Sequence, residues 1–313
     1  MARNPVQFQP GLSLPAFLAR YGTEAQCRAA LFSMRWPNGF VCSACSNTTY
    51  CTLGRGVFQC HHCHQQTSLI AGTIFHATKL PLRTWFLAIY LLTQRKQSVS
   101  ALQLSRDLGV SYNTAWRLKH KILQVMRERC GGERLAGRIE IDDAYLGGER
   151  PGKPGRGAAG KVPFVAAVET SDDGRPRKAQ FRCVSGFTRA ALEAYAQAGV
   201  APASHVVSDG LNCFQAFDQP NYRHERIVSG GGRASVEQPA FKWVNTMLGN
   251  VKNAIIGNLH AVGHAHVPRY LAEYEYRFNR RFDLPAMIER FTYAALRTAP
   301  MPQPLLTMAE AYT

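Results

Sequence analysis

Long apolar runs are missing from this 313-residue chain, and none approaches the roughly 20 residues that cross a bilayer. The opening residues, MARNPVQFQPGLSLPAF, also lack the apolar stretch of a secretory signal. We therefore expect no membrane partner and a cytoplasmic, reducing setting. In that setting the nine cysteines are better explained as metal ligands and buried thiols than as a disulfide framework.

Acidic residues are scarce relative to basic ones: 21 Asp and Glu stand against 37 Lys and Arg, a formal net charge of +16. A basic excess of this size favours a polyanionic partner, because each phosphate that a protein neutralises releases condensed counterions. Internal repeats and long low-complexity tracts are also absent, and 46% of the residues are hydrophobic. This composition predicts two or three globular domains and little disorder.

The residue pattern divides the chain into five segments. Apolar residues at helical spacing lie on either side of a cysteine-rich stretch, β-rich runs begin after Gly137, and helical spacing returns from about Phe241. The expected segments are a helical N-terminal segment (1–38), a cysteine-rich segment (39–72), a helical segment (78–130), a β-rich domain with helices (137–298) and a C-terminal tail (299–313).

Two cysteine pairs dominate the cysteine-rich segment: Cys42-x-x-Cys45 and Cys60-x-x-Cys63. Two-residue gaps let the thiolates of each pair reach one tetrahedral ion, so the four cysteines predict a zinc ribbon with one structural zinc. Four buried free thiols are the alternative. The neighbouring side chains that we expect outside the ligand set, around it or facing DNA, are Cys51, His61, His62 and His64.

Residues 99–122 have the pattern of a helix-turn-helix, with the turn at Gly109-Val110-Ser111. Ser111 is expected to cap the second helix. The outward face of that helix would carry the DNA-binding side chains Tyr112, Asn113, Arg117, Lys119 and His120. An ordinary helical hairpin with a solvated basic face is the alternative.

Two aspartates stand at strand positions of the β-rich region. Asp142 lies inside an apolar strand, where alternation places it and Asp143 on opposite faces. Asp209 follows a second apolar strand, at the end where catalytic groups often lie. Either alone is commonly a turn or cap residue, but an acid inside a strand costs free energy unless it is paired or holds a cation. Together they predict a shared site for divalent metal.

Three stretches, RIEIDDAYLGG, VVSDGLNCF and the block from Trp243 to Arg281, resemble the DDE-superfamily transposases of insertion sequences, in particular the branch with an N-terminal zinc ribbon. The resemblance extends from about residue 14 to residue 295. It implies an α+β chain in which a zinc ribbon and a helix-turn-helix segment precede a ribonuclease-H-like mixed β-sheet domain flanked by helices.

The resemblance implies that Asp142 and Asp209 are the first two metal ligands. The family's third acid opens a helix and precedes a basic residue by two turns, yet no Glu occurs in residues 243–257. Asn245, seven residues before Lys252, has the matching offset, and a subgroup of the family carries Asn there. An amide oxygen can ligate a hard cation without adding charge. A helix N-cap is the alternative for Asn245.

The function implied is that of a metal-dependent DNA transposase, with two Mg²⁺ or Mn²⁺ ions at these three residues. It would bind terminal inverted repeats, hydrolyse a phosphodiester at the element's ends and join the freed 3′-hydroxyl to target DNA, with Lys252 contacting phosphate. Partners would be double-stranded DNA and a second copy of the chain, in a prokaryotic cytoplasm at the nucleoid. The alternatives are an inactive DNA-binding regulator derived from a transposase and a nuclease that cuts without joining.

Two basic stretches complete the expected DNA surface. The resemblance implies a DNA-facing helix with Arg277, Arg280 and Arg281, for which a solvated basic face is the alternative. Glu273 and Glu275 on the same helix are minor candidates for metal ligands. The Gly- and Pro-rich loop at 147–162 is expected to be either a linker or a DNA contact.

Overall fold

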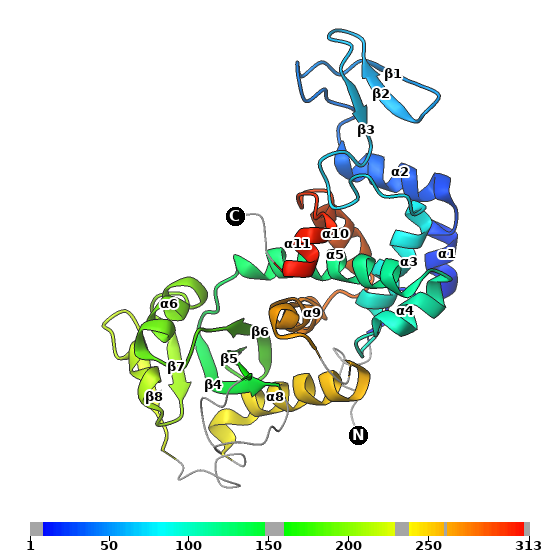
Figure 1. Cartoon of the computed structure of the whole chain (residues 1–313). Helices are drawn as coiled ribbons and strands as arrows, with labels where there is room; N and C mark the ends of the chain where they lie inside the picture. The colour runs from blue at the N-terminus through cyan, green and yellow to red at the C-terminus, as the bar shows by residue number, and fades with distance from the viewer. Residues whose placement is uncertain (1–8, 148–159, 229–237, 260–261, 310–313) are drawn as a thin grey trace. The chain divides into compact units, whose positions relative to one another are not determined.

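The computed structural model describes residues 9–147, 160–228, 238–259 and 262–309 (Figure 1). The chain forms two compact units, one of Met1–Val125 with Phe282–Thr313 and one of Met126–Arg281. Most of the basic loop expected at 147–162 lies outside the described residues. Among the described residues, no helix combines the length and the apolar character that a bilayer crossing needs.

Helices form most of the first unit. They are α1 (Leu14–Tyr21), α2 (Glu24–Arg35), α3 (Leu82–Gln94), α4 (Ala101–Leu108), the first part of α5 (Tyr112–Gly131), α10 (Met287–Ala295) and α11 (Gln303–Met308). Thr23 begins α2 with a capping box, in which its hydroxyl accepts the Gln26 N–H and the Gln26 side chain accepts the Thr23 N–H. The carboxylate of Glu24 accepts the N–H groups of Leu82 and Arg83 and so caps α3.

The return of the chain to the first unit at Phe282 differs from the boundary expected near residue 298. Gln94 donates a side-chain N–H to the carbonyl of Leu284 at 3.0 Å, and Met287, Ile288 and Phe291 are buried. The chain breaks between α9 (Val267–Asn279) and α10, at a segment that contains Pro285, but helical spacing on both sides of this break does not reveal that the packing partners change there.

A three-stranded antiparallel sheet follows α2, in the order β1 (Tyr50–Thr52), β2 (Val57–Cys60) and β3 (Gln66–Ser68). Aromatic rings join this small sheet to the end of α2: ring centroids lie 5.3 Å apart between Phe32 and Phe58 and 6.2 Å apart between Phe32 and Tyr50. Arg35 donates to the carbonyls of Leu69 and Ala71 and so ties the same helix end to the chain after β3.

The expected helix-turn-helix is present in α4 and α5. Gly109 ends α4 in the left-handed conformation with φ +64°, which favours glycine, and its N–H bonds to the Ser105 carbonyl. Ser111 accepts the N–H of Thr114 at 3.3 Å, so it caps α5 as the sequence predicts.

The second unit contains a five-stranded mixed sheet in the order β6-β5-β4-β7-β8. Antiparallel pairing joins β4 (Arg138–Leu146), β5 (Val162–Thr170) and β6 (Pro176–Cys183), while β7 (His205–Ser208) runs parallel to both β4 and β8 (Arg223–Arg226). This arrangement agrees with the expected α+β fold with a mixed sheet.

Helices pack on both faces of this sheet. One face packs against α6 (Arg189–Gly199) and the short helix η1 (Asn212–Phe217). The other packs against η2 (Pro239–Phe241), α8 (Lys242–Ala254) and α9 (Val267–Asn279), with η3 (Ile255–Leu259) and η4 (His264–His266) between the last two. Residues of β4 alternate accordingly, because Ile139 and Ile141 face α6 whereas Ala144 faces α8.

Candidate metal and DNA-binding sites

The pairing of β4 with β7 sets two acids side by side. Glu140 pairs with Val207 in the parallel register, so the same register extended by two residues places Asp209 beside Asp142. Asp142, Asp143 and Asp209 each offer a carboxylate oxygen, and these oxygens all lie within 4.8 Å of one another. Two oxygens on opposite sides of one Mg²⁺ ion are about 4.2 Å apart, so this group has the dimensions and the donor chemistry of a divalent cation site.

Asp143 is the member of this group that strand alternation assigned to the other face. Alternation fixes the direction of each Cβ, but β7 pairs with β4 over Arg138, Ile139 and Glu140, and the acids lie just past this stretch. The backbone N–H of Asp143 also donates to Asp142 Oδ1 at 2.8 Å, which turns the Asp142 carboxylate toward the next residue. The adjacent pair of aspartates was the available signal in the sequence.

The carboxyl group of Asp142 is costly to ionise at this position. Burial raises the pKa of Asp142 to about 7, helped by the charges of Asp143 and Asp209, while Lys252 acts in the opposite direction. A divalent cation would relieve both the desolvation and the repulsion, so the electrostatics of the site fit such an ion.

Helix α8 carries the other two expected site residues. Asn245 is the fourth residue of α8, whose N-cap is Phe241, so Asn245 is not the N-cap that was its alternative role. Asn245 and Lys252 lie on one helix face because seven residues make nearly two turns. Lys252 is exposed, and it lies near enough to Asp142 for its charge to oppose the rise in the pKa of that carboxyl group.

Hydrogen bonds hold both the side chain and the backbone carbonyl of Asp209. Its Oδ1 accepts the N–H of Leu211 at 3.0 Å, and its backbone carbonyl accepts the hydroxyl of Ser208 at 2.9 Å. Glu273 and Glu275, the minor candidates for ligands, are buried elsewhere: Glu273 pairs with Arg277 and Glu275 pairs with Arg182. Both therefore lie outside this acidic group.

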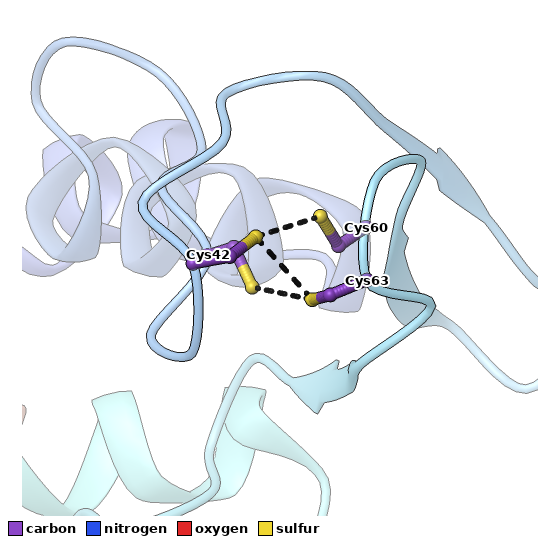
Figure 2. A group of neighbouring side chains, drawn as sticks. Cys42, Cys60 and Cys63 are labelled. Atoms are coloured by element: carbon purple, nitrogen blue, oxygen red, sulfur yellow. Dashed lines mark hydrogen bonds between the residues drawn. The ribbon is translucent and has the colours of Figure 1, made fainter.

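The four paired cysteines converge as a zinc ribbon requires, and Figure 2 labels three of them, Cys42, Cys60 and Cys63. Their sulfurs approach to 3.3 Å between Cys45 and Cys63, 3.5 Å between Cys42 and Cys63, and 3.6 Å between Cys45 and Cys60. Ligand sulfurs around a tetrahedral zinc lie about 3.8 Å apart, so the group fits the ion. Hydrogen bonds from backbone N–H groups, first that of Cys63, lower the pKa of Cys60 to about 6 and favour its thiolate.

The nearby side chains stay outside this sulfur group, as expected. Cys51 donates toward the Gln59 carbonyl at 3.9 Å, and the three histidines at positions 61, 62 and 64 are exposed. Four sulfurs within 4.8 Å of one another can supply all four ligands of a zinc ion, so this site is suited to a structural zinc.

The expected DNA-reading face of α5 needs a correction. Tyr112, Asn113 and Arg117 are exposed, but Lys119 and His120 are fully buried. Lys119 donates to the carbonyl of Val99, and the His120 ring stacks on Trp116 with centroids 4.0 Å apart. The prediction treated α5 as a helix with a single buried face, whereas the middle of α5 is buried on more than one side.

The prediction that three arginines at the end of α9 face DNA also needs correction. Arg277 is 9% exposed and lies 3.5 Å from the Glu273 carboxylate, while Arg280 pairs with Glu133 at 3.0 Å. Arg281 donates to the backbone carbonyls of Arg177 and Phe278. These guanidinium groups bind the protein itself, because the amphipathic helix turns this side toward β6 and the end of α5 rather than toward solvent.

The fold and the two sites define a class of protein: a zinc ribbon and a helix-turn-helix joined to a mixed-sheet domain with an acidic group on neighbouring strands. Residues 22–66 match the transposase zinc-ribbon domain, and residues 134–279 match the ISXO2-like transposase domain. The chain therefore carries two domains of insertion-sequence transposases, the zinc-ribbon domain and the ISXO2-like domain.

One curated relative is an uncharacterized protein in transposable element ISH50 of Halobacterium salinarum, with 31% identity over 128 residues. The match covers 40% of this chain and 42% of that protein, so the chain spans less than half the length of this relative. Among solved structures, the Mos1 transposase paired-end complex with left transposon end has a TM-score of 0.20 and 10% identity over 68% of this chain and 79% of that one.

Proposed function

We propose that this chain is a metal-dependent DNA transposase that cuts at the ends of an insertion sequence and joins them to target DNA. The observation that carries the proposal is the convergence of Asp142 and Asp143, in the middle of β4, with Asp209, just after the end of β7, inside the transposase domain. A ribonuclease-H-like sheet that gathers carboxylates from neighbouring strands is suited to phosphodiester chemistry.

The acids would hold Mg²⁺ or Mn²⁺, two ions at full occupancy. Asp142 and Asp209 would be the main ligands, Asp143 would add a third charge, and Asn245 would contribute a neutral oxygen. Divalent ions bound there would activate the attacking oxygen and stabilise the leaving one. Lys252, exposed on the same helix face as Asn245, would bind a phosphate of the DNA and balance its charge.

DNA recognition would fall to the first unit. The exposed Tyr112, Asn113 and Arg117 on α5 would contact the terminal inverted repeats, and the zinc ribbon would support this contact. Two ends must meet before they are joined to a target, so we expect at least a dimer on DNA. With chromosomal DNA as its substrate, the protein would work in the cytoplasm at the nucleoid.

The test is cleavage and joining of DNA that carries the element's ends, with and without Mg²⁺. Asp142→Asn should lower cleavage at least 100-fold, because the site loses a charged ligand. Asp172→Asn, at an exposed aspartate of a turn in the same unit, is the matched control and should cut as the wild type does. Equal cleavage by Asp142→Asn and wild type would sink the enzyme and leave the DNA-binding regulator. Cleavage without joining of a pre-cut end would identify a nuclease.

A further inference from the structure

A chain of hydrogen bonds in the second unit runs from the surface to Asp209. The Asp218 carboxylate lies 2.6 Å from Nδ1 of His224, and Nε2 of His224 lies 2.8 Å from the hydroxyl of Ser208. That hydroxyl also reaches the backbone carbonyl of Asp209 at 2.9 Å. Asp218 at the end of η1, His224 in β8 and Ser208 in β7 are thus linked in series. The last bond of the series reaches the backbone of Asp209, a proposed metal ligand.

The order Asp, His, Ser is also that of a serine nucleophile and its base, but the burial excludes that use here. Ser208 is 0% exposed, so no substrate reaches its hydroxyl. The accessible member is Asp218, whose side chain is 42% exposed, while the His224 side chain is 3% exposed. The reactive end of a serine triad would need the opposite order of exposure.

The same contacts suit a group that holds backbone in place. Ser208 is the last residue of β7, and its carbonyl accepts the N–H of Ile227, so the strand is anchored up to this residue. Asp209 has left the strand and precedes Gly210, which restrains the backbone little. The Ser208 hydroxyl therefore fixes the peptide that follows Asp209, and the imidazole fixes the hydroxyl. Asp218 and the Phe217 ring, 5.9 Å away between centroids, orient the imidazole.

We propose that Asp218 and His224 are positioning residues that act through Ser208 to hold the Asp209 carboxylate in the geometry that binds a divalent cation. The inference rests on the proposed function, because it concerns the metal site of that function. Groups that orient a metal ligand without touching the ion commonly change metal affinity by about 10- to 100-fold when they are removed.

The test is Mn²⁺ binding to the full chain, followed by electron paramagnetic resonance. His224→Ala and Ser208→Ala should each weaken Mn²⁺ binding about tenfold. The double variant should bind no more weakly than either single one, because both changes break the same chain. Ser208→Ala removes a single oxygen, so it keeps the test sharp even where His224→Ala folds poorly.

The protein offers a matched control in His205, on the same pair of strands. Its Nε2 lies 2.9 Å from Oε2 of Glu225, a histidine–carboxylate contact like that of His224, but at the start of β7. His205→Ala should bind Mn²⁺ within twofold of wild type. A signature that a merely structural role would not give is a shift of the His224 Nδ1 proton resonance when Mg²⁺ is added.

The outcomes separate this inference from the proposed function. One outcome would overturn only the positioning role of Asp218 and His224. In that outcome the wild type binds Mn²⁺ and Asp142→Asn does not, but His224→Ala and Ser208→Ala both bind it with unchanged affinity. An equal loss in His205→Ala would overturn it as well, since the effect would then be general loosening of the strands. If the wild-type protein binds no Mn²⁺, both the proposed function and the positioning role of Asp218 and His224 are wrong.

Discussion

Glu140 on β4 accepts the backbone N–H of Trp243 at 2.7 Å, at the start of α8. The same oxygen accepts the N–H of Val244 at 3.0 Å, and the other carboxylate oxygen pairs with Arg138 at 3.0 Å. A buried carboxylate from a strand thus caps a helix that has no side-chain cap of its own. The strand that carries Asp142 and the helix that carries Asn245 are fixed to each other by this contact.

We predict that Glu140→Gln destabilises the second unit by about 1–3 kcal/mol, because two helix N–H groups and Arg138 lose a charged partner. Urea denaturation followed by circular dichroism measures this. Glu193→Gln removes one partner of a surface pair with Arg189 and should cost less than about 1 kcal/mol. Equal losses in the two variants would contradict the capping role.

The raised pKa of Asp142 predicts a stability that depends on pH in the metal-free protein. Folding raises this pKa from 3.8 to about 7, so the folded state holds the proton more tightly, and the contribution to stability falls as the pH rises from about 4 to 7. Asp142→Asn should therefore raise the stability at pH 8 by roughly 1–3 kcal/mol and change it little at pH 4.

Thermal unfolding in chelator measures this difference, with Asp172→Asn as the control. Added Mg²⁺ should reverse the order at pH 8, because the wild type gains the binding free energy and the variant does not. A variant less stable than wild type at pH 8 in chelator would show that the carboxylate is favourably paired in the absence of metal.

Asp143 and Asn245 compete for the role of third ligand, and their chemistry predicts which one contributes more. Asp143→Asn removes a charge and should weaken Mn²⁺ binding about tenfold, whereas Asn245→Ala removes a neutral oxygen and should weaken it less. Asn245→Glu in the Asp143→Asn background should restore part of the affinity. Calorimetric titration with Mn²⁺ decides the point, and a larger loss in Asn245→Ala would assign the third position to the helix.

Zinc removal tests the four-cysteine site independently of the acidic one. Fresh protein should hold about one equivalent of zinc, and Cys60→Ser should lose it together with the order of the small sheet. Because Phe58 and Tyr50 pack on α2 residues, tryptophan fluorescence from Trp36 should change as zinc leaves. Cys51→Ser is the matched control and should keep its zinc. Protein with less than half an equivalent would remove the assignment.

The exposed part of α5 is expected to bind DNA and the buried part to support the fold. Arg117→Ala should weaken binding to end DNA and lower the slope of log affinity against log salt by about one. Lys119→Ala should chiefly lower the melting temperature, because its ammonium bonds to the Val99 carbonyl inside the first unit. Binding curves at several salt concentrations distinguish the two, and an unchanged slope in Arg117→Ala would count against the proposed contact.

Local spacing predicted what local geometry decides. The cysteine pairs, the turn at Gly109 and the cap at Ser111 each depend on a few neighbouring residues, and all occur as expected. The strands with Asp142 and Asp209 were also found, since apolar runs identify them. Burial between elements was harder to predict. Helical spacing suggests that Lys119 and Arg277 are exposed, yet both are buried. Lys119 bonds to the carbonyl of Val99, and Arg277 pairs with Glu273 one helical turn away.

Asp143 and the hydrogen bonds of His224 show why the rest of the site could not be predicted from the sequence. Alternation along one strand does not reveal where a neighbouring strand stops pairing, and that stop lets Asp143 join Asp142 and Asp209. His224 and Ser208 meet across a parallel pair of strands that no spacing rule connects. Both cases depend on the register between strands, which is a property of the folded sheet.

The interruption of the first unit by the second also orders events during synthesis. Gln94 finds its partner carbonyl at Leu284, so the first unit lacks α10 until the ribosome has made every residue of the unit that carries the acids. Translation that stops before Phe282 would therefore release a complete acid-bearing sheet attached to an unfinished first unit.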